Sequence, residues 1–376
     1  VISDLPVSVP MLVTHSVGQG GGSIVSLTSS GGIQIGPRSA GANPGPACFD
    51  RGGLEATVTD ADVVLGYIDP NYFLGGRIKL NKDKAISVIK RRVADRLGTS
   101  VEEAAYLIKE TVDKNIQKEL LQFLQTKGIE PGRLADLALV AYGGAGPTHC
   151  SGFVKGLKFG KVLTSPYAST FCAFGFSTTD LLHRYSKYEQ ITLFDGVAYF
   201  ADYEMINQAV RQMLEVARRD IKGEGFSPDD AVYYLELIGD EDLGEHRVRS
   251  NQTRLSSEKE VKNLCAQFER VKKSGVPKIT ISAIMLNALV AMPHFELNPG
   301  PLSGEDPDHA LRGERDVLWS PESGYQKTPI YEREPLVPGN RVVGPAIIQA
   351  KDTTYVIPAN RSFYISEYSH GVLEEV

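Results

Sequence analysis

One short unit constrains the fold of this chain more than any other feature. Leu137–Tyr142 is an apolar run of strand length, and the glycines at 143, 144 and 146 predict a sharp turn directly after it. Pro147 suits the first position of a helix, and the segment KVLTSP at 161–166 predicts another strand. Strand, glycine turn, helix and strand in this order predict an α/β domain of the kind that holds a nucleotide or a substrate.

Two helices are predicted before this unit. Residues 81–98 place apolar side chains three or four apart, with Asn81 as the N-cap and Gly98 at the end. Residues 100–128 carry a longer apolar stripe and begin with the capping-box pair Ser100 and Glu103. Stripes of this kind usually face a core, so we expect packing and no ligand site on them.

Changes in composition predict three parts in this chain of 376 residues. Residues 1–185 form the α/β domain, and their first 80 residues are rich in glycine and favour β structure, including EATVTDADVVLG at 55–66. Residues 186–300 alternate helical and strand patterns and predict an α+β domain. Residues 301–376 read as a polar linker followed by short strands, which predicts a small terminal β-rich module.

Charge and cysteine usage exclude several classes of protein. The net charge is −6, and lysines and arginines are dispersed along the chain, so a nucleic-acid partner is not expected. The 4 cysteines stand far apart and fit neither a disulfide framework nor a metal site. No apolar run reaches about 18 residues and the first ten residues do not resemble a signal peptide, so we expect a cytoplasmic protein without a membrane partner.

The two glycine motifs, GQGGGS at 18–23 and GGAGP at 143–147, are weak evidence when each is taken alone. Glycine lets backbone N–H groups approach a phosphate closely. Neither motif has the lysine of a phosphate-binding P-loop, and neither fits the GxGxxG dinucleotide pattern. A plain turn therefore remains the alternative for both.

Five motifs taken together indicate a protein family far more specifically than either glycine motif does alone. They are PMLVTHSVGQGGGSI, GPRSAGANPGPACFDRGG, ATVTDADVVLGYIDPNYFLGG, LVAYGGAGPTHC and GNRVVGPAIIQAKDTTYVIP. Their order and spacing resemble the hydantoinase A / 5-oxoprolinase / acetone carboxylase family over most of residues 7–185 and again over about 311–360.

This resemblance implies a fold of the actin, sugar-kinase and heat-shock-ATPase type, with two α/β domains that close over ATP and Mg²⁺. It implies activation of a substrate by phosphorylation, beside a hydantoinase B-like subunit. Two groups of residues would line the nucleotide pocket: Gly20, Gly21, Gly22 and Ser23, and Gly143, Gly144, Ala145, Gly146 and Pro147.

One departure from the family pattern is informative. Family members usually carry DxGGTxxD phosphate motifs upstream of the matching segment, and this sequence has none. The chain therefore resembles the second half of such a subunit. We expect it to be inactive alone and to need either an N-terminal half of the same subunit or a separate chain that carries the phosphate motifs.

The segments HALRGERDVLW and SGYQKTPIYEREPLVPGNRVVGPAII resemble acetone and acetophenone carboxylase subunits. This favours ATP-dependent carboxylation of a ketone, through phosphorylation of its enolate or of bicarbonate. Two alternatives remain open at this point: an ATP-dependent hydrolase of cyclic amides (a hydantoinase or 5-oxoprolinase), and a non-catalytic half that completes a partner's nucleotide site.

Four single residues are candidates for chemistry. His15 and Asp60 are the catalytic candidates, because an imidazole can relay a proton and the carboxylates of Asp60 and Asp62, placed along a strand edge, could act as a base or hold Mg²⁺. Arg38, in an irregular loop, and His149 are the candidates for binding substrate or an anion. Structural roles are the alternatives: helix capping for Asp60, a hydrogen-bonded imidazole for the histidines and a solvated side chain for Arg38. No metal-ligand set is predicted.

Overall fold

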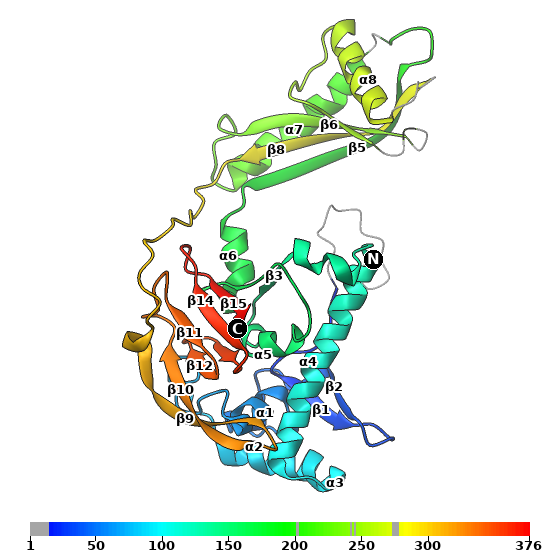
Figure 1. Cartoon of the computed structure of the whole chain (residues 1–376). Coiled ribbons are helices and arrows are strands. Elements are labelled where there is room, and N and C mark those ends of the chain that lie inside the picture. The colour runs from blue at the N-terminus through cyan, green and yellow to red at the C-terminus, as the bar shows by residue number, and fades with distance from the viewer. Residues whose placement is uncertain (1–14, 201–202, 241–242, 244–245, 273–277) are drawn as a thin grey trace. The chain divides into compact units, whose positions relative to one another are not determined.

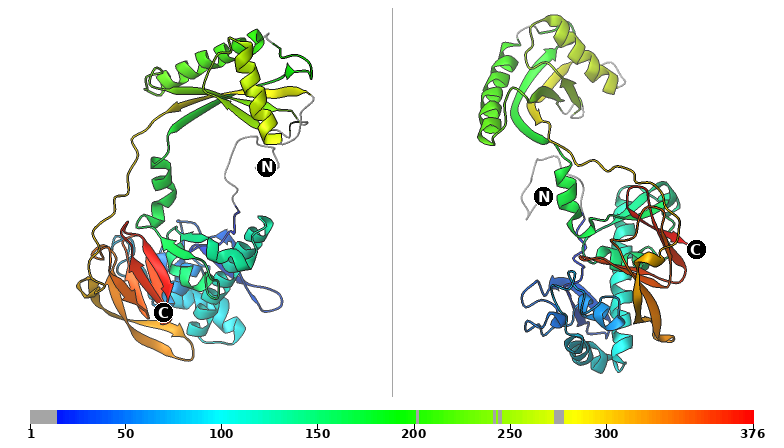
Figure 2. Two further views of the ribbon diagram at one scale, coloured as in Figure 1. Left: turned by 45° about the horizontal axis from the view of Figure 1, so that its top comes forward. Right: turned by 90° about the vertical axis from the view of Figure 1, so that its left-hand side faces the viewer.

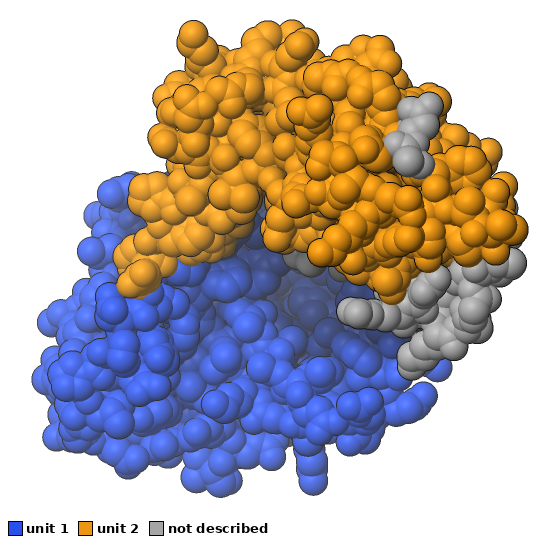
Figure 3. Space-filling view, turned by 90° about the horizontal axis from the view of Figure 1, so that it is seen from above, with its two compact units in different colours: residues 1–174, 297–376 blue, residues 175–296 orange. Residues whose placement is uncertain are grey.

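The structure is a computed structural model that describes residues 15–200, 203–240, 243, 246–272 and 278–376. The chain divides into two compact units, Val1–Phe174 with Leu297–Val376 and Gly175–Glu296, which Figure 3 colours separately. Unit 2 is therefore inserted into unit 1. This differs from the predicted boundaries at 185 and 300, because the long strand β5 (Leu181–Phe194) pairs with β8 (Ile279–Val290) and so belongs to the insertion.

Unit 1 begins with a two-stranded antiparallel sheet and a group of helices (Figure 1). The strands are β1 (Ser23–Leu27) and β2 (Ile33–Ser39). The 3-10 turn η1 (Ala47–Phe49) precedes helix α1 (Val58–Leu65). Helix α2 (Lys82–Ile89) continues through a π-helical turn, η2 (Lys90–Ala94), into α3 (Asp95–Leu97). The long helix α4 (Val101–Thr126) follows.

The sequence pattern correctly predicts two of these helices and misses one. Asn81 caps α2, and Ser100 and Glu103 form the capping box of α4. The segment 55–66, predicted as β structure, contains α1 instead. Thr57 caps it, and every residue of this eight-residue helix is buried, so it has no polar face to reveal a helical period.

The predicted strand–turn–helix–strand unit is confirmed. It consists of β3 (Ala138–Ala141), α5 (Gly146–Phe153) and β4 (Lys161–Thr164), and β3 pairs with β4 in parallel. A 3-10 turn, η3 (Pro131–Asp136), enters the unit. After it come η4 (Ala168–Thr170) and α6 (Phe171–Ser177).

The C-terminal strands do not form a separate module, contrary to the prediction for 301–376. One sheet of five strands has the order β11-β14-β15-β4-β3, and another of four strands has the order β13-β12-β10-β9. Figure 1 shows these orange and red strands beside α5 and α4. Their bounds, after the 3-10 turn η6 (Asp308–Ala310), are β9 (Leu311–Ser320), β10 (Gly324–Glu332), β11 (Arg341–Val343), β12 (Ala346–Gln349), β13 (Thr354–Ile357), β14 (Arg361–Ile365) and β15 (Gly371–Glu375).

Shared cores explain this integration. Val317, Ile347 and Val356 from the C-terminal strands are buried against α1, α2 and α4. Phe363 and Leu373 are buried with residues of β3, α5 and β4. Apolar side chains of these short strands pack against residues of the segment 47–168 in shared buried clusters. The C-terminal strands and that segment therefore form one domain.

Unit 2 has its own core. Its antiparallel sheet has the order β5-β8-β6-β7, with β6 (Val232–Gly239) and β7 (Arg247–Ser250). Helices α7 (Glu204–Gly223) and α8 (Glu258–Lys272) pack on this sheet through a cluster of buried side chains (Figure 2).

Candidate functional site

The two glycine motifs, far apart in the sequence, meet at one pocket of unit 1. Gly21 from the first motif and Gly144 from the second both line a pocket of about 430 Å³. The pocket wall combines apolar side chains with hydroxyl and carboxylate groups, as small-molecule sites generally do. The remaining lining residues are Thr59, Asp62, Ile68, Phe73, Leu74, Ala145, Thr148, Ser169 and Asp352.

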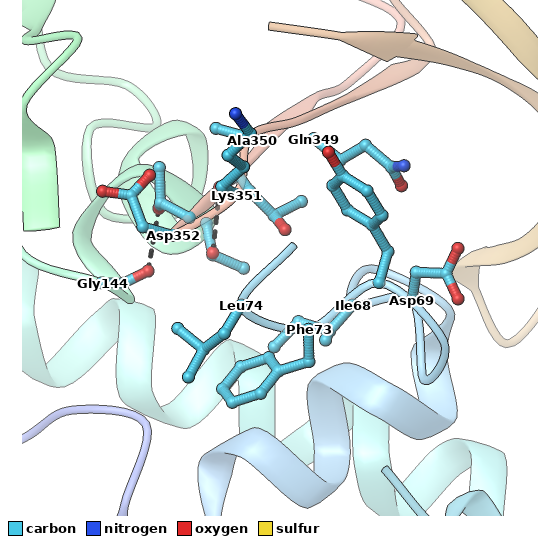
Figure 4. Close-up of a pocket in the computed structure, with 13 residues that line it drawn as sticks. Ile68, Asp69, Phe73, Leu74, Gly144, Gln349, Ala350, Lys351 and Asp352 are labelled. Carbon is cyan, nitrogen blue, oxygen red and sulfur yellow. Dashed lines mark hydrogen bonds between the residues drawn. The ribbon is translucent and has the colours of Figure 1, made fainter. Parts of the chain in front are cut away.

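A smaller cavity of about 40 Å³ continues this pocket and shares several of its lining residues. Figure 4 shows it between Phe73 and Leu74 on one side and the turn that carries Lys351 and Asp352 on the other. Residues more than 200 positions apart therefore form one continuous surface around Gly144.

The first glycine turn is fastened to α1. The backbone N–H of Thr59 donates a hydrogen bond of 2.8 Å to the carbonyl of Gly21. A Cβ at Gly21 would lie 2.6 Å from the hydroxyl oxygen of Thr59, so a side chain there would displace its neighbour. The Ser23 hydroxyl closes the turn by accepting from the N–H of Gly20 at 2.9 Å. Of the predicted residues 20–23, only Gly21 lines the pocket.

The second glycine turn is held by contacts to distant segments. Gly143 has a φ of +89°, which favours glycine, and its N–H donates to the carbonyl of Ala168 at 2.7 Å. The hydroxyl of Thr353 donates to the carbonyl of Gly144 at 2.8 Å. Ala145 precedes α5 without a side-chain cap, so the N-terminus of this helix is available to an acceptor at the pocket.

Asp60 lies in helix α1 and not on the predicted strand edge, and its hydrogen bonds match the capping role that was the alternative to catalysis. It is completely buried at the third position of α1. Its carboxylate accepts from the N–H and hydroxyl of Thr57, at 3.0 and 2.8 Å, and from the N–H of Cys48 at 2.7 Å. These bonds use the carboxylate to close the capping box and to fix the loop before α1.

Asp62, two residues further along α1 and therefore on a different side of the helix, is placed differently. It is 1% exposed and lines the pocket, and its Oδ1 has no hydrogen-bond partner among the described residues. Its Oδ2 lies 3.4 Å from Nε2 of His149. A buried carboxylate oxygen without a partner is costly, so this atom marks a place where the protein retains an acceptor.

His149 stands between two carboxylates and is 3% exposed. Its Nδ1 lies 2.8 Å from Asp113 Oδ1, and Asp113 Oδ2 lies 2.9 Å from Nζ of Lys109. Burial alone lowers the pKa of His149, but the charges of Asp62 and Asp113 outweigh burial and raise the pKa to about 10. The imidazole is therefore charged at neutral pH, and a row of alternating charges runs from Lys109 to the pocket.

Two protein-family models match successive segments of the chain. The hydantoinase/oxoprolinase model matches residues 1–185, and the model of the hydantoinase/oxoprolinase C-terminal domain matches residues 198–375. The chain belongs to the hydantoinase/oxoprolinase family. The family predicted from the five motifs is thereby confirmed.

Individual relatives include carboxylase and lactamase subunits. The chain is 37% identical to the acetophenone carboxylase gamma subunit of Aromatoleum aromaticum, over 100% of this chain and 52% of that protein. It is 30% identical to the caprolactamase subunit alpha of Pseudomonas jessenii, over 94% of this chain and 51% of that protein. This member of the family thus spans about half the length of the curated relatives that it matches.

The structural comparison supports the predicted fold class. A nucleotide-free structure of acetone carboxylase matches with a TM-score of 0.81 and 28% identity, over 95% of this chain and 52% of that one. The mixed α/β class is confirmed, and the likeness is consistent with the predicted fold of the actin, sugar-kinase and heat-shock-ATPase type.

The other predicted residues of this family member lie apart from the pocket. His15 is exposed, with Nε2 2.8 Å from Glu119 Oε2 and its ring stacked on Phe123. Arg38 is exposed on β2, which corrects the prediction of an irregular loop around it. His149 does not line the pocket, since both ring nitrogens face carboxylates. The start of the motif at Pro10, up to residue 14, lies outside the described residues.

Sequence reasoning missed Ser169 and Asp352, which line the pocket and bond to each other through the serine hydroxyl. Asp352 does lie in the motif GNRVVGPAIIQAKDTTYVIP, so the resemblance carried a signal for its position but not for its role. Within the described part of the chain, no group of three or more His, Cys, Asp or Glu side chains could hold a metal ion. In the same part, no helix is long and apolar enough to cross a membrane.

Proposed function

We propose that this chain supplies part of the nucleotide site of an ATP-dependent carboxylase that phosphorylates a ketone enolate, bicarbonate or both to form a β-keto acid. The observation that carries this proposal is the convergence of Gly21 and the Gly144–Ala145 turn on one pocket that also holds Thr59 and Asp62. The 37% identity to an acetophenone carboxylase subunit and the fold of acetone carboxylase support the choice of reaction.

The residues present fit a nucleotide. A Cβ at Gly21 would press on Thr59, so the backbone forms this part of the pocket wall. The uncapped N-terminus of α5 offers N–H groups and a favourable dipole to an anionic group. Mg²⁺ would enter with the nucleotide and neutralise phosphate charge, and the carboxylate of Asp352 would be the pocket group to hold it on the protein side.

ATP supplies a phosphoryl group that turns a poor electrophile or nucleophile into a reactive one. The chain's own residues position that chemistry. The two turns fix the backbone of the pocket, while Phe73 and Leu74 provide an apolar wall that excludes water. The hydroxyl of Thr59 provides a hydrogen-bond donor on the same wall, whereas the hydroxyls of Thr148 and Ser169 donate to Thr354 and Asp352 and offer acceptor oxygens.

Because the chain covers 52% of its carboxylase relative, we propose that the phosphate motifs reside elsewhere, in an N-terminal half of the same subunit or in a separate chain. We also propose a hydantoinase B-like subunit as partner and the cytoplasm as location. The chain alone is then inactive, and ATP hydrolysis by the isolated chain would contradict this.

Labelled bicarbonate tests the reaction. The complete enzyme is supplied with ATP, Mg²⁺ and ¹⁴C-bicarbonate, together with acetone or acetophenone in one set and caprolactam, hydantoin or 5-oxoproline in the other. Incorporation of label that depends on a ketone is the expected result. Ring opening without incorporation would reject the carboxylase.

That second result would instead support an ATP-dependent cyclic-amide hydrolase, which the 30% identity to a caprolactamase subunit keeps in view. A third candidate is a non-catalytic half that completes a partner's nucleotide site, and ATP hydrolysis by this chain alone would reject it.

A further inference from the structure

Asp62 and Asp352 line the pocket, and Asp60 lies two residues before Asp62 on α1. The hydrogen bonds of these three carboxylates distinguish them. Asp60 is fully used by backbone and hydroxyl donors of its own loop. Asp352 accepts from the hydroxyl of Ser169. Asp62 is buried and lines the pocket, and its Oδ1 is a buried oxygen without a hydrogen-bond partner in the described structure.

The structure also explains how this carboxylate is held. Its second oxygen faces His149, whose other ring nitrogen is bound by Asp113, and Lys109 completes the row. Gly152 on α5 makes this possible, because a Cβ there would lie 1.8 Å from Asp113 Oδ2. Such a row orients one carboxylate, as the supporting shell of a catalytic group does.

We propose that Asp62 is the general base of the pocket, and that His149 and Asp113 are its positioning residues. This rests on the proposed nucleotide site. The group it deprotonates is a hydroxyl on a trigonal carbon, which bicarbonate and the enol form of a ketone share; removal of the enol proton gives the enolate oxygen that is phosphorylated. As the acceptor oxygen bonds to the γ-phosphorus of ATP, the bond from that phosphorus to the bridging oxygen breaks, ADP leaves, and the hydroxyl proton passes to Asp62 Oδ1.

The experiment compares the complete wild-type enzyme with Asp62→Asn, which keeps the shape of the side chain but cannot take up the proton. Asp83→Asn, an exposed carboxylate in the first turn of α2, is the matched control. Calorimetry measures binding of a non-hydrolysable ATP analogue with Mg²⁺. ATP consumption is followed with bicarbonate alone, ketone alone and both, which identifies the acceptor.

We expect Asp62→Asn to bind the analogue within about threefold of the wild type and to lose at least about 100-fold in kcat in every arm that is active in the wild type. Asp83→Asn should match the wild type in analogue binding and in kcat. A kcat of Asp62→Asn that is close to the wild-type value, or that more Mg²⁺ restores, would reject the assignment of Asp62 as a general base. If Asp62→Asn loses analogue binding and Asp83→Asn retains it, the Asp62 carboxylate has a binding role, and its assignment as a general base is rejected. If the wild type fails to bind the analogue, the proposed function fails and this inference fails with it.

His149→Gln provides a second measurement that does not alter the carboxylate. It removes the cation that faces Asp62, while Asp113, Lys109 and Tyr67 remain around the site. Loss of a neighbouring positive charge favours the protonated form of a carboxyl group. The acidic side of the kcat profile should therefore move to higher pH, with analogue binding retained. An unshifted profile would reject the positioning role.

Discussion

At the scale of single residues, neighbouring positions on one short helix have opposite uses. Asp60 and Asp62 are both buried on α1, yet the first closes a capping box and the second faces the pocket. The sequence shows only two aspartates two positions apart. Which one carries an uncommitted oxygen depends on His149, 87 positions away, and on the loop at Cys48, so a local pattern cannot decide it.

Asp60→Ala should lower the free energy of unfolding by about 2–4 kcal/mol, because it removes the cap partner and orphans buried N–H groups. Urea denaturation followed by circular dichroism measures this. Asp83→Ala, at an exposed position, should stay within about 0.5 kcal/mol of the wild type. Equal stability of the two variants would contradict the structural role of Asp60.

Gly21→Ala should disturb the pocket, since the new Cβ would meet the Thr59 hydroxyl at 2.6 Å. Overpacking of this kind costs about 1–3 kcal/mol. We expect weaker binding of the ATP analogue by the complete enzyme, with the fold retained. At Gly132 a Cβ would meet no atom within 4 Å, so Gly132→Ala is the control. Unchanged binding by Gly21→Ala would make this stretch an ordinary turn.

At the scale of elements, the charged row joins three helices, α1, α4 and α5, through their buried faces. The sequence predicts α4 and α5 well, because α4 has a long apolar stripe and a capping box and α5 follows a glycine turn with a proline. It does not predict that α4 and α5 approach closely at Gly152, since that contact depends on which helix faces meet. The start of β9 falls in the segment that the sequence pattern describes as a polar linker.

The charged row makes stability depend on pH. The pKa of His149 is raised from 6.5 to about 10 in the folded chain, so the folded state binds a proton that the unfolded state releases. This contribution is complete below pH 6.5 and is lost as the pH rises to about 10. The free energy of unfolding should fall by up to about 1.4 kcal/mol per pH unit in this range. Urea denaturation at several pH values should show a flatter dependence for His149→Gln, and equal slopes would contradict the assignment.

At the scale of the whole molecule, unit 2 is an insertion with its own core, whereas the C-terminal strands share theirs with the first half of unit 1. The composition of residues 301–376 instead predicted a separate module. Short strands and turns have the same sequence pattern whether they form a module of their own or complete another sheet. Pairing of β15 with β4 is a long-range property that no local pattern contains.

Two fragments test this organisation. Residues 175–296 should fold when expressed alone, with cooperative thermal unfolding and dispersed amide signals in NMR spectra, because one buried cluster joins the sheet to both helices. Residues 301–376 should remain unfolded alone, because the partners of their buried side chains are missing. A cooperative transition in the second fragment would contradict the shared core.

The pairing of β4 (Lys161–Thr164) with β15 (Gly371–Glu375) also sets an order of events during synthesis. A ribosome completes all of unit 2 before it reaches the strand that β4 needs. The insertion can thus fold while the nascent chain is still growing, whereas the sheet next to the glycine turn waits until the last residues have emerged. Premature termination between the end of the insertion at Glu296 and the start of β15 at Gly371 would release a chain with a finished insertion and an unfinished pocket domain.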